Sequence, residues 1–353
     1  MGFSAIIVDD SKVALRALKE VISRDSRFES IQTAEDAYQA KTLILEKKPD
    51  LVILDIGLPG IDGLDFLKII MKERPLPVVI HSGMAGEGSK NASLALEYGA
   101  LDVIEKTSSS GQSSVSQPNF CDRLASAAKA QVRRRTGHKP PDFKPHHKQP
   151  KNLPPEILVL IGASTGGPRA LQTILQDLPR DMPPICITQH MPASMTDVMA
   201  KRLDSLSRVT VTEAKDGERL KQGHVYISPG DAHLLVSWSN RGFYEAKLML
   251  GEPIKGQKPS VDALFKSGAK SSKSNGIVAL LMTGMGDDGA DGLKELKRAG
   301  AFTAVQSEKT CSIASMPKAA MRLKAHQGVW DLGAITTNLR KAVFASVHWY
   351  QHS

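Results

Sequence analysis

The sequence predicts a two-domain α/β protein in which each domain contains a parallel sheet covered by helices on both faces. Its 353 residues suit about two domains of roughly 100–200 residues each. Apolar strand-like runs alternate with helix-like segments in both halves of the chain, which is typical of parallel sheets. A basic, proline-rich segment separates the two halves.

Five apolar runs predict the strands of the N-terminal half, and helix-like segments lie between them. These runs are residues 4–10, 28–36, 50–57, 76–83 and 100–106. An amphipathic segment at 119–134 predicts the helix that completes this half. Because every strand is followed by a helix, we expect the strands to be parallel and to end at one common edge of the sheet.

The C-terminal half repeats this pattern and predicts a second, mainly parallel sheet of the doubly wound type. Its strand-like runs are residues 156–164, 184–191, 224–230, 276–284 and 300–307. In open α/β sheets, ligands bind outside the carboxyl ends of the strands. We therefore expect the functional crevice of this half at that edge.

Two segments of biased composition set the expected domain limits. Residues 107–118 are rich in serine, and residues 133–155 are basic and rich in proline. Between Gln131 and Lys151 there are seven Lys or Arg and one Asp, so this stretch carries +6 of the net charge of +9. Phe143 is its single Phe, Trp or Tyr, so it lacks the interleaved aromatic residues that stack on successive bases, which favours a solvated linker over a nucleic-acid surface. We expect one domain at 1–134, with 107–118 as an insertion, a linker at 135–155 and a second domain at 156–353.

The composition also excludes several classes of protein. No apolar run approaches the roughly 20 residues that a membrane span needs. The N-terminus becomes acidic at "VDD" too early for a signal peptide. The three cysteines, Cys121, Cys186 and Cys311, are few, odd in number and widely spaced, which argues against disulfides and against a zinc site. We expect a cytoplasmic protein without membrane insertion.

Five polar residues follow strands of the N-terminal half. Asp9 and Asp10 end the first strand and Asp55 ends the third, so these carboxylates converge at one edge and would repel each other without a hard cation, for which Mg²⁺ is the usual candidate. Ser82 ends the fourth strand and Lys106 the fifth. Mg²⁺ and an ammonium around one carboxylate suit phosphoryl transfer, because both neutralise charge on the phosphoryl oxygens. The alternative is that these residues are ordinary polar residues that begin loops after strands. Five suitable residues at strand ends of one sheet argue against it.

The stretch "GASTG" at 162–166 matches the G-x-S-x-G pattern of a nucleophile turn around Ser164. The motif is short and occurs by chance, and neither G-x-x-x-x-G-K-[ST] nor G-x-G-x-x-G is present at this turn to indicate a phosphate loop. A serine nucleophile needs a base and a group that orients the base. Among the six histidines after Ser164, His190 ends the next predicted strand and would emerge at the same edge.

The glycine-rich stretch at 280–292 offers the third group. It carries Asp287, Asp288 and Asp291 after an apolar strand, where an aspartate could fix the tautomer of the histidine. Acidic residues also favour helix starts, so an N-terminal cap cluster is the alternative. From the residues alone, Asp287 and Asp288 are equally good candidates for the aspartate that orients the histidine. The order Ser, His, Asp differs from that of α/β-hydrolases.

The N-terminal half, over about residues 1–130, resembles the response-regulator receiver domain through "VDDS", "LDIGLPGIDGLDFL", "HSG" and "EK". The resemblance implies a flavodoxin-like (βα)5 fold in which Asp55 accepts a phosphoryl group from a partner histidine kinase. It implies that Asp9, Asp10, Asp55 and the Gly57 carbonyl hold Mg²⁺, and that Ser82 is the hydroxyl switch. The chain departs from the receiver pattern after the lysine, where it has Thr107 in place of the usual proline.

Residues 156–347 resemble the chemotaxis-specific protein-glutamate methylesterase (CheB) family. The matching segments are "IGASTGGPRAL", "QHMPASMTDVMAKRLD", "GHVYISPGDAHLLV", "KPSVDALFKSGAK", "LLMTGMGDDGADGL" and "QSEKTCSIASMPKAA". The resemblance implies a Ser164–His190–Asp288 triad, since the family aspartate directly precedes the glycine of "GMGxDG". It also implies that the Met285 backbone donates to the oxyanion and that Thr165 is a supporting hydroxyl.

This second resemblance implies the hydrolysis of glutamate γ-methyl esters, and the deamidation of glutamine, on the cytoplasmic helices of a chemoreceptor. It implies no cofactor for the esterase and a receiver that controls access to the crevice when Asp55 is phosphorylated. Two alternatives stay open. One is a phosphorylation-controlled DNA-binding regulator, although the sequence has no helix-turn-helix-like segment, so we do not expect a nucleic-acid partner. The other is a non-catalytic scaffold with an esterase-like domain.

Overall fold

The computed structural model describes residues 2–83, 87–106, 113, 115, 119–130 and 153–352. The chain divides into two compact units, Met1–Gly137 and His138–Ser353. The predicted linker lies almost wholly outside the described residues, and so does most of the serine-rich stretch. The domain limits therefore stay predictions. Among the described helices, none is both long and apolar enough to cross a membrane.

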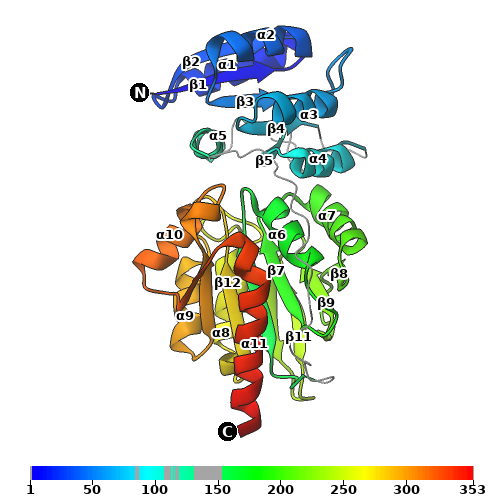
Figure 1. Ribbon diagram of the computed structural model, residues 1–353, viewed down its shortest axis with the longest axis vertical. Coiled ribbons are helices and arrows are strands. Elements are labelled where there is room, and N and C mark those ends of the chain that lie inside the picture. Colours follow the sequence, from blue (N-terminus) through cyan, green and yellow to red (C-terminus); the bar gives the residue numbers. More distant parts are fainter. Residues whose placement is uncertain are drawn as a thin grey trace. The chain divides into compact units, whose positions relative to one another are not determined.

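The N-terminal unit contains a five-stranded sheet in the order β2-β1-β3-β4-β5, with every pair parallel (Figure 1). The five predicted strands are all present. Their bounds are β1 (Phe3–Val8), β2 (Phe28–Ala34), β3 (Leu51–Leu54), β4 (Val78–Ser82) and β5 (Asp102–Glu105). Every residue of β3 and β4 is buried, which requires cover on both faces of the sheet.

Five helices connect or follow these strands. They are α1 (Lys12–Ser23), α2 (Ala37–Lys47), α3 (Gly63–Glu73), α4 (Glu87–Tyr98) and α5 (Phe120–Ala128). The first three begin at polar caps, where the side chains of Ser11, Asp36 and Asp62 accept hydrogen bonds from backbone amides in the first turn. The helix predicted at 119–134 is therefore present but ends at Ala128 in the structure.

The C-terminal unit contains a seven-stranded parallel sheet in the order β14-β13-β12-β6-β7-β9-β8. Its strands are β6 (Leu158–Ala163), β7 (Ile185–Gln189), β8 (Thr210–Glu213), β9 (His224–Ile227), β12 (Ile277–Leu281), β13 (Phe302–Gln306) and β14 (Gly328–Trp330). The five predicted strands all lie in this sheet. The doubly wound, mainly parallel fold class is confirmed.

Four strands were not predicted, and each is partly exposed. The edge strands β8 and β14 are short, and each has one buried and one half-buried residue, which is too few to give an apolar run. A separate antiparallel pair, β10 (His233–Trp238) and β11 (Tyr244–Met249), follows β9 and completes the set.

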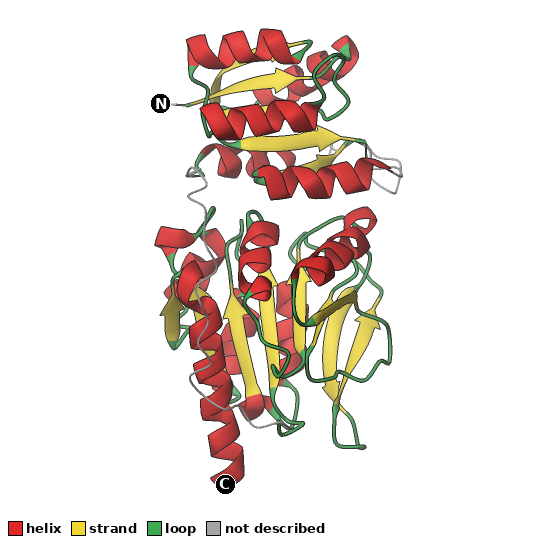
Figure 2. Cartoon of the chain, turned by 45° about the vertical axis from the view of Figure 1, so that its right-hand side comes forward, coloured by secondary structure: helices red, strands yellow, loops and turns green. Residues whose placement is uncertain are grey.

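Helices cover the large sheet (Figure 2). They are α6 (Gly167–Gln176), α7 (Ala193–Leu206), α8 (Val261–Ala269), α9 (Ala290–Arg298), α10 (Ser315–Arg322) and α11 (Ile335–His352).

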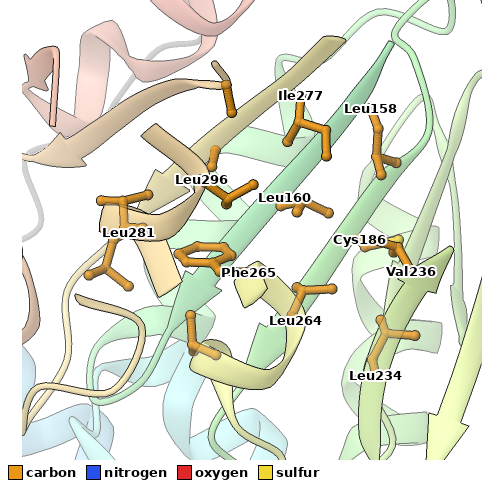
Figure 3. Close-up of a cluster of buried hydrophobic side chains, with 14 of the residues drawn as sticks. Leu158, Leu160, Cys186, Leu234, Val236, Leu264, Phe265, Ile277, Leu281 and Leu296 are labelled. Atoms are coloured by element: carbon orange, nitrogen blue, oxygen red, sulfur yellow. The ribbon is translucent and has the colours of Figure 1, made fainter. Parts of the chain in front are cut away.

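Helix α8 is held by the hydrophobic core of this unit. Its first five residues, Val261–Phe265, are all buried. Leu264 and Phe265 belong to a cluster that joins β6, β12 and the β10–β11 pair (Figure 3). Members from those strands include Leu158, Leu160, Leu234, Val236, Ile277 and Leu281. Because such cores are densely packed, the N-terminus of α8 has a fixed place beside the carboxyl ends of β6 and β12.

Candidate active site

The strand order of the large sheet reverses between β6 and β12, so the carboxyl ends of these strands form a topological switch point. The two strands pair in parallel register up to Leu281 opposite Gly162. Beyond that pair, the amide of Ser164 donates a hydrogen bond of 3.0 Å to the carbonyl of Thr283. The serine singled out in the sequence therefore lies at the crevice that this fold provides.

A tight turn presents Ser164 at the end of β6. Gly166 has a φ of +78°, a conformation that glycine adopts without strain, and α6 begins at the next residue. A Cβ atom on Gly166 would lie 2.5 Å from Oγ of Ser312. The glycines of "GASTGG" thus allow the chain to reverse direction directly after the serine.

Three side chains from three strand ends form a hydrogen-bonded chain. Ser164 Oγ lies 3.1 Å from His190 Nδ1, and His190 Nε2 lies 2.8 Å from Asp288 Oδ2. The His190 and Asp288 side chains are 8% and 3% exposed. Because an ionised carboxylate can only accept, the imidazole carries its hydrogen on Nε2, and its Nδ1 lone pair faces the serine hydroxyl. This is the arrangement that a general base next to a nucleophile requires.

Gln189 and the backbone fix the position of His190. The amide of His190 donates to the carbonyl of Ala163, at 3.1 Å, as β7 ends beside β6. The Gln189 side chain is buried, and its Nε2 lies 3.0 Å from the carbonyls of both Ser164 and His190. The nucleophile turn and the base are thereby tied to each other.

The Asp288 carboxylate lies at the N-terminus of α8. It accepts hydrogen bonds from the amides of Val261 (2.7 Å) and Asp262 (2.9 Å) and from the hydroxyl of Ser260 (2.9 Å). Burial by itself raises the pKa of Asp288, but the His190 contact and these amides outweigh burial, so the pKa lies below its ordinary value. The helix N-terminus therefore keeps Asp288 ionised beside His190.

The two residues that the sequence left equal have different places in the structure. Asp288 is buried against His190, whereas the Asp287 side chain is exposed. Asp291 lies on α9 and forms an ion pair of 2.6 Å with Lys255. Asp288, the residue that the family resemblance implied, is the aspartate that contacts the histidine.

The amides around the serine differ in their availability. Within the described part of the chain, the amide of the half-buried Met285 donates to no backbone or side-chain acceptor. The amide of Ser164 is already bonded to the Thr283 carbonyl, so it is not free for a substrate oxygen. Thr165 is buried directly beside the serine.

A second cluster lies at the switch point of the N-terminal sheet, between β1 and β3. Carboxylate oxygens of Asp9, Asp10 and Asp55 lie within 4.8 Å of one another. Lys106 Nζ lies 2.7 Å from Asp55 Oδ2 and 2.8 Å from Asp9 Oδ2. Burial raises the pKa of Asp9. Burial alone would lower the pKa of Lys106, but the two carboxylates outweigh it and raise that pKa.

This donor set fits a hard divalent cation. It offers three carboxylates, and among the described residues the buried Asp9 Oδ2 faces only the Lys106 ammonium. Gly57 lies beside them, since a Cβ atom on it would be 3.8 Å from Asp55 Oδ2. Ser82 is buried at the end of β4, and its carbonyl accepts from the Lys106 amide at 3.0 Å. Thr107 lies outside the described residues.

Sequence reasoning missed three residues that hold the Ser164–His190–Asp288 site together. They are Gln189, Ser260 and Thr283. Gln189 and Thr283 both lie near the carboxyl ends of predicted strand-like runs, so the strand-end rule that found Ser164 applies to both. Ser260 precedes an apolar helical run with an acidic residue in its first turn, which is the signature of a helix cap. The cap was visible in the sequence, but its contact with Asp288 was not.

Comparison with known proteins agrees with this geometry. Residues 159–339 match the family model described as CheB methylesterase, and residues 5–113 match the response regulator receiver domain. The chain belongs to the CheB methylesterase family. It is 38% identical over 348 residues to a protein-glutamate methylesterase/protein-glutamine glutaminase of Oleidesulfovibrio alaskensis, covering 96% of this chain and 97% of that protein.

Other relatives and one solved structure extend the comparison. The Salmonella typhimurium protein of the same name is 38% identical over 341 residues, covering 96% of both chains. The crystal structure of the Thermotoga maritima CheB methylesterase catalytic domain matches with 37% identity and a TM-score of 0.51, covering 54% of this chain and 98% of that one. Both the family and the receiver-plus-methylesterase architecture of the chain are therefore shown.

Proposed function

We propose that this protein is a phosphorylation-regulated protein-glutamate methylesterase and protein-glutamine glutaminase that acts on the cytoplasmic helices of a chemoreceptor. The observation that carries the proposal is the hydrogen-bonded chain Ser164–His190–Asp288 at the switch point of the large sheet. The names of relatives that match over 96% of the chain support the substrate class. The same names support glutamine as a second substrate.

In the proposed reaction, Ser164 Oγ attacks the carbonyl carbon of the glutamate γ-methyl ester. His190 Nδ1 takes the hydroxyl proton as the new C–O bond forms, and Asp288 stabilises the resulting imidazolium. His190 then gives this proton to the methoxy oxygen, so methanol leaves and a glutamyl ester of Ser164 remains.

Water completes the cycle. His190 removes a proton from the attacking water and returns one to Ser164 Oγ as the glutamate carboxylate is released. With glutamine as substrate, the same steps release ammonia in place of methanol. The Met285 amide would donate to the oxyanion, and one well-placed donor of this kind contributes about 3–4 kcal/mol to transition-state stabilisation.

The receiver domain would regulate this reaction. Asp55 would take the phosphoryl group from a histidine kinase, with Lys106 neutralising charge on the phosphoryl oxygens. Asp9, Asp10, Asp55 and the Gly57 carbonyl would hold Mg²⁺, which supplies further charge neutralisation when bound. Ser82 would follow the phosphoryl group as the switch hydroxyl. Phosphorylation would then change access to the crevice, as a local charge change biasing a two-state element.

The test is methanol release from a methylated chemoreceptor. Ser164→Ala should reduce release to the background rate, while phosphorylation of Asp55 by a small phosphodonor stays intact. Ser205→Ala is the matched control, because Ser205 is exposed on α7 and its hydroxyl donates locally, to the Arg202 carbonyl. Full methanol release by Ser164→Ala would refute the triad. Receptor binding without release by the unmodified chain would indicate the scaffold alternative.

A further inference from the structure

The hydrogen-bonded chain continues behind Asp288. Ser260 Oγ donates to Asp288 Oδ1 at 2.9 Å, and the amide of Ser260 donates to His233 Nδ1 at 3.1 Å. His233 Nε2 lies 3.1 Å from the carbonyl of Glu252. Ser260 and His233 are both 0% exposed. Six groups from separate parts of the chain thus run, through five hydrogen bonds, from the Glu252 carbonyl to the Ser164 hydroxyl.

Each link in this chain has one possible direction. Because the Ser260 amide is a donor, Nδ1 of His233 must be the acceptor, so the hydrogen of this imidazole is on Nε2 and points to the Glu252 carbonyl. Ser260 Oγ accepts from the Ala263 amide at 3.3 Å and keeps its own hydrogen for the carboxylate of Asp288. The hydroxyl orientation is therefore set by its surroundings before any substrate binds.

The two oxygens of Asp288 have separate partners. Oδ1 accepts from the Ser260 hydroxyl and the Asp262 amide, and Oδ2 accepts from the Val261 amide and His190 Nε2. Removing the hydroxyl would leave Oδ1 with one partner and lessen what holds the carboxylate against rotation. The carboxylate would then hold the His190 ring less firmly in its orientation, although every catalytic group would still be present.

We propose that Ser260, held in place by His233, is a positioning residue that orients Asp288 toward His190. The inference rests on the proposed function, because it takes Ser164, His190 and Asp288 to be the catalytic groups. Ser260 makes no hydrogen bond to the described nucleophile or base and acts through Asp288. A misplacement of about 1 Å in such a constellation can cost about 10²-fold in rate.

Ser260 also caps α8, and two substitutions separate the two roles. Glycine is a good cap residue but has no hydroxyl, so Ser260→Gly removes the Asp288 contact while it disturbs the helix little. Ser260→Thr keeps both the cap and the donor. Ser267→Ala is the matched control on the same helix, because the Ser267 hydroxyl accepts from the Val236 amide and donates to the Leu264 carbonyl without contacting Asp288.

The experiment measures kcat and KM for methanol release from methylated receptor with the full chain, per mole of folded protein determined by circular dichroism. Ser260→Ala and Ser260→Gly should lower kcat by about 10- to 100-fold with KM nearly unchanged, since the loss is confined to the transition state. Ser260→Thr should recover most of the lost rate. Ser267→Ala should lower the melting temperature and leave kcat unchanged.

A second pair of variants tests His233. His233→Ala removes the acceptor of the Ser260 amide and should lower kcat as Ser260→Gly does. His233→Asn offers an amide oxygen near the place of Nδ1 and should retain more activity than His233→Ala. Wild-type kcat in the folded His233→Ala protein would overturn the role of His233.

Ser164→Ala distinguishes failure of the inference from failure of the proposed function. If Ser164→Ala is inactive while Ser260→Gly and Ser260→Ala keep wild-type kcat, the positioning role is wrong and the esterase stands. If Ser164→Ala itself keeps full activity, the proposed function fails. A kcat loss in Ser260→Gly that Ser267→Ala shares equally would show a general effect of disturbing α8 and would also overturn the positioning role.

Discussion

Gly284 lies directly against the nucleophile. A Cβ atom at this position would be 2.1 Å from Met316 Sδ and 2.6 Å from Ser164 Cβ. No real side-chain carbon is accommodated at such distances without movement of a neighbour. Glycine is therefore required at position 284, because the loop after β12 approaches the Ser164 turn too closely to leave room for a Cβ atom.

Gly284→Ala should abolish most of the methanol release, because either Ser164 or Met316 must move by more than the tolerance of the triad. Overpacking of this kind also costs about 1–3 kcal/mol of stability. Methanol release and the melting temperature, measured together, check the prediction. Gly251→Ala is the control, since a Cβ on Gly251 would meet nothing within 4 Å. Unchanged activity in Gly284→Ala would contradict the rigidity inferred for this contact.

The ionised state of Asp288 links residue chemistry to stability. Its pKa lies below the ordinary value of 3.8, since His190 and the α8 amides outweigh burial. The stabilisation this provides is complete above about pH 3.8 and is lost as the pH falls through the lower folded-state pKa. Asp288→Asn should therefore lose less stability than the unmodified chain on acidification from pH 5 to pH 3. Chemical unfolding at several pH values checks this, and equal slopes for the two proteins would be contrary to it.

At the scale of elements, Thr283 joins three segments. Its carbonyl accepts from Ser164, and its amide donates to the Gln306 side chain at the end of β13. Its hydroxyl accepts from the Ile313 amide at 3.1 Å and lies 3.0 Å from the Thr165 carbonyl. The end of β12 is thus the point where the nucleophile turn, β13 and the segment before α10 are held in one geometry.

Thr283→Val keeps the shape of the side chain but leaves the buried Ile313 amide without its acceptor, which costs about 1–3 kcal/mol. We expect a lower melting temperature and a lower kcat, because the turn that carries Ser164 loses a support. Thr303→Val is the matched control, since the buried Thr303 hydroxyl donates to the Gln327 side chain and to no triad residue. It should lose stability but not kcat. Equal kcat in the two folded variants would argue against a role for Thr283 in holding the turn.

Burial explains which strands the sequence predicted. Every residue of β6, β7 and β12 is buried, so β6 and β12 appear as unbroken runs without polar side chains, and β7 becomes polar only at its last two residues. The unpredicted β8 and β11 have exposed residues mixed with buried ones, and their stability comes from pairing with neighbours that a local pattern does not reveal.

At the scale of the whole molecule, the acidic cluster lies in the N-terminal unit and the triad in the C-terminal unit. The regulatory proposal is that phosphorylation at the first site controls hydrolysis at the second. Asp55→Asn should abolish stimulation of methanol release by a phosphodonor and leave the basal rate unchanged, because Asp55 and the triad belong to separate units. Removal of divalent cations by EDTA should have the same effect on the unmodified chain, since the Asp9, Asp10 and Asp55 carboxylates would lose their cation.

The assay is methanol release with and without acetyl phosphate, in Mg²⁺ and in EDTA. Asp50→Asn is a control in the same unit, since Asp50 bonds to Ser4 at the amino end of β3, away from the acidic cluster. Undiminished stimulation in Asp55→Asn, or a fall in the basal rate in EDTA, would contradict the division of labour between the units.

The sequence by itself determined both parallel sheets, the serine and histidine at the ends of β6 and β7, and the acidic cluster at the ends of β1 and β3. These follow from local pattern, because a buried parallel strand is mainly apolar and the polar residues at its carboxyl end mark the functional edge. The tertiary structure decided what local pattern left open. It placed Asp288 and not Asp287 against His190, paired the Ser164 amide with the Thr283 carbonyl, and brought the cap residue Ser260 to Asp288. Those contacts depend on how α8 packs on the core, and no short window of sequence contains both partners.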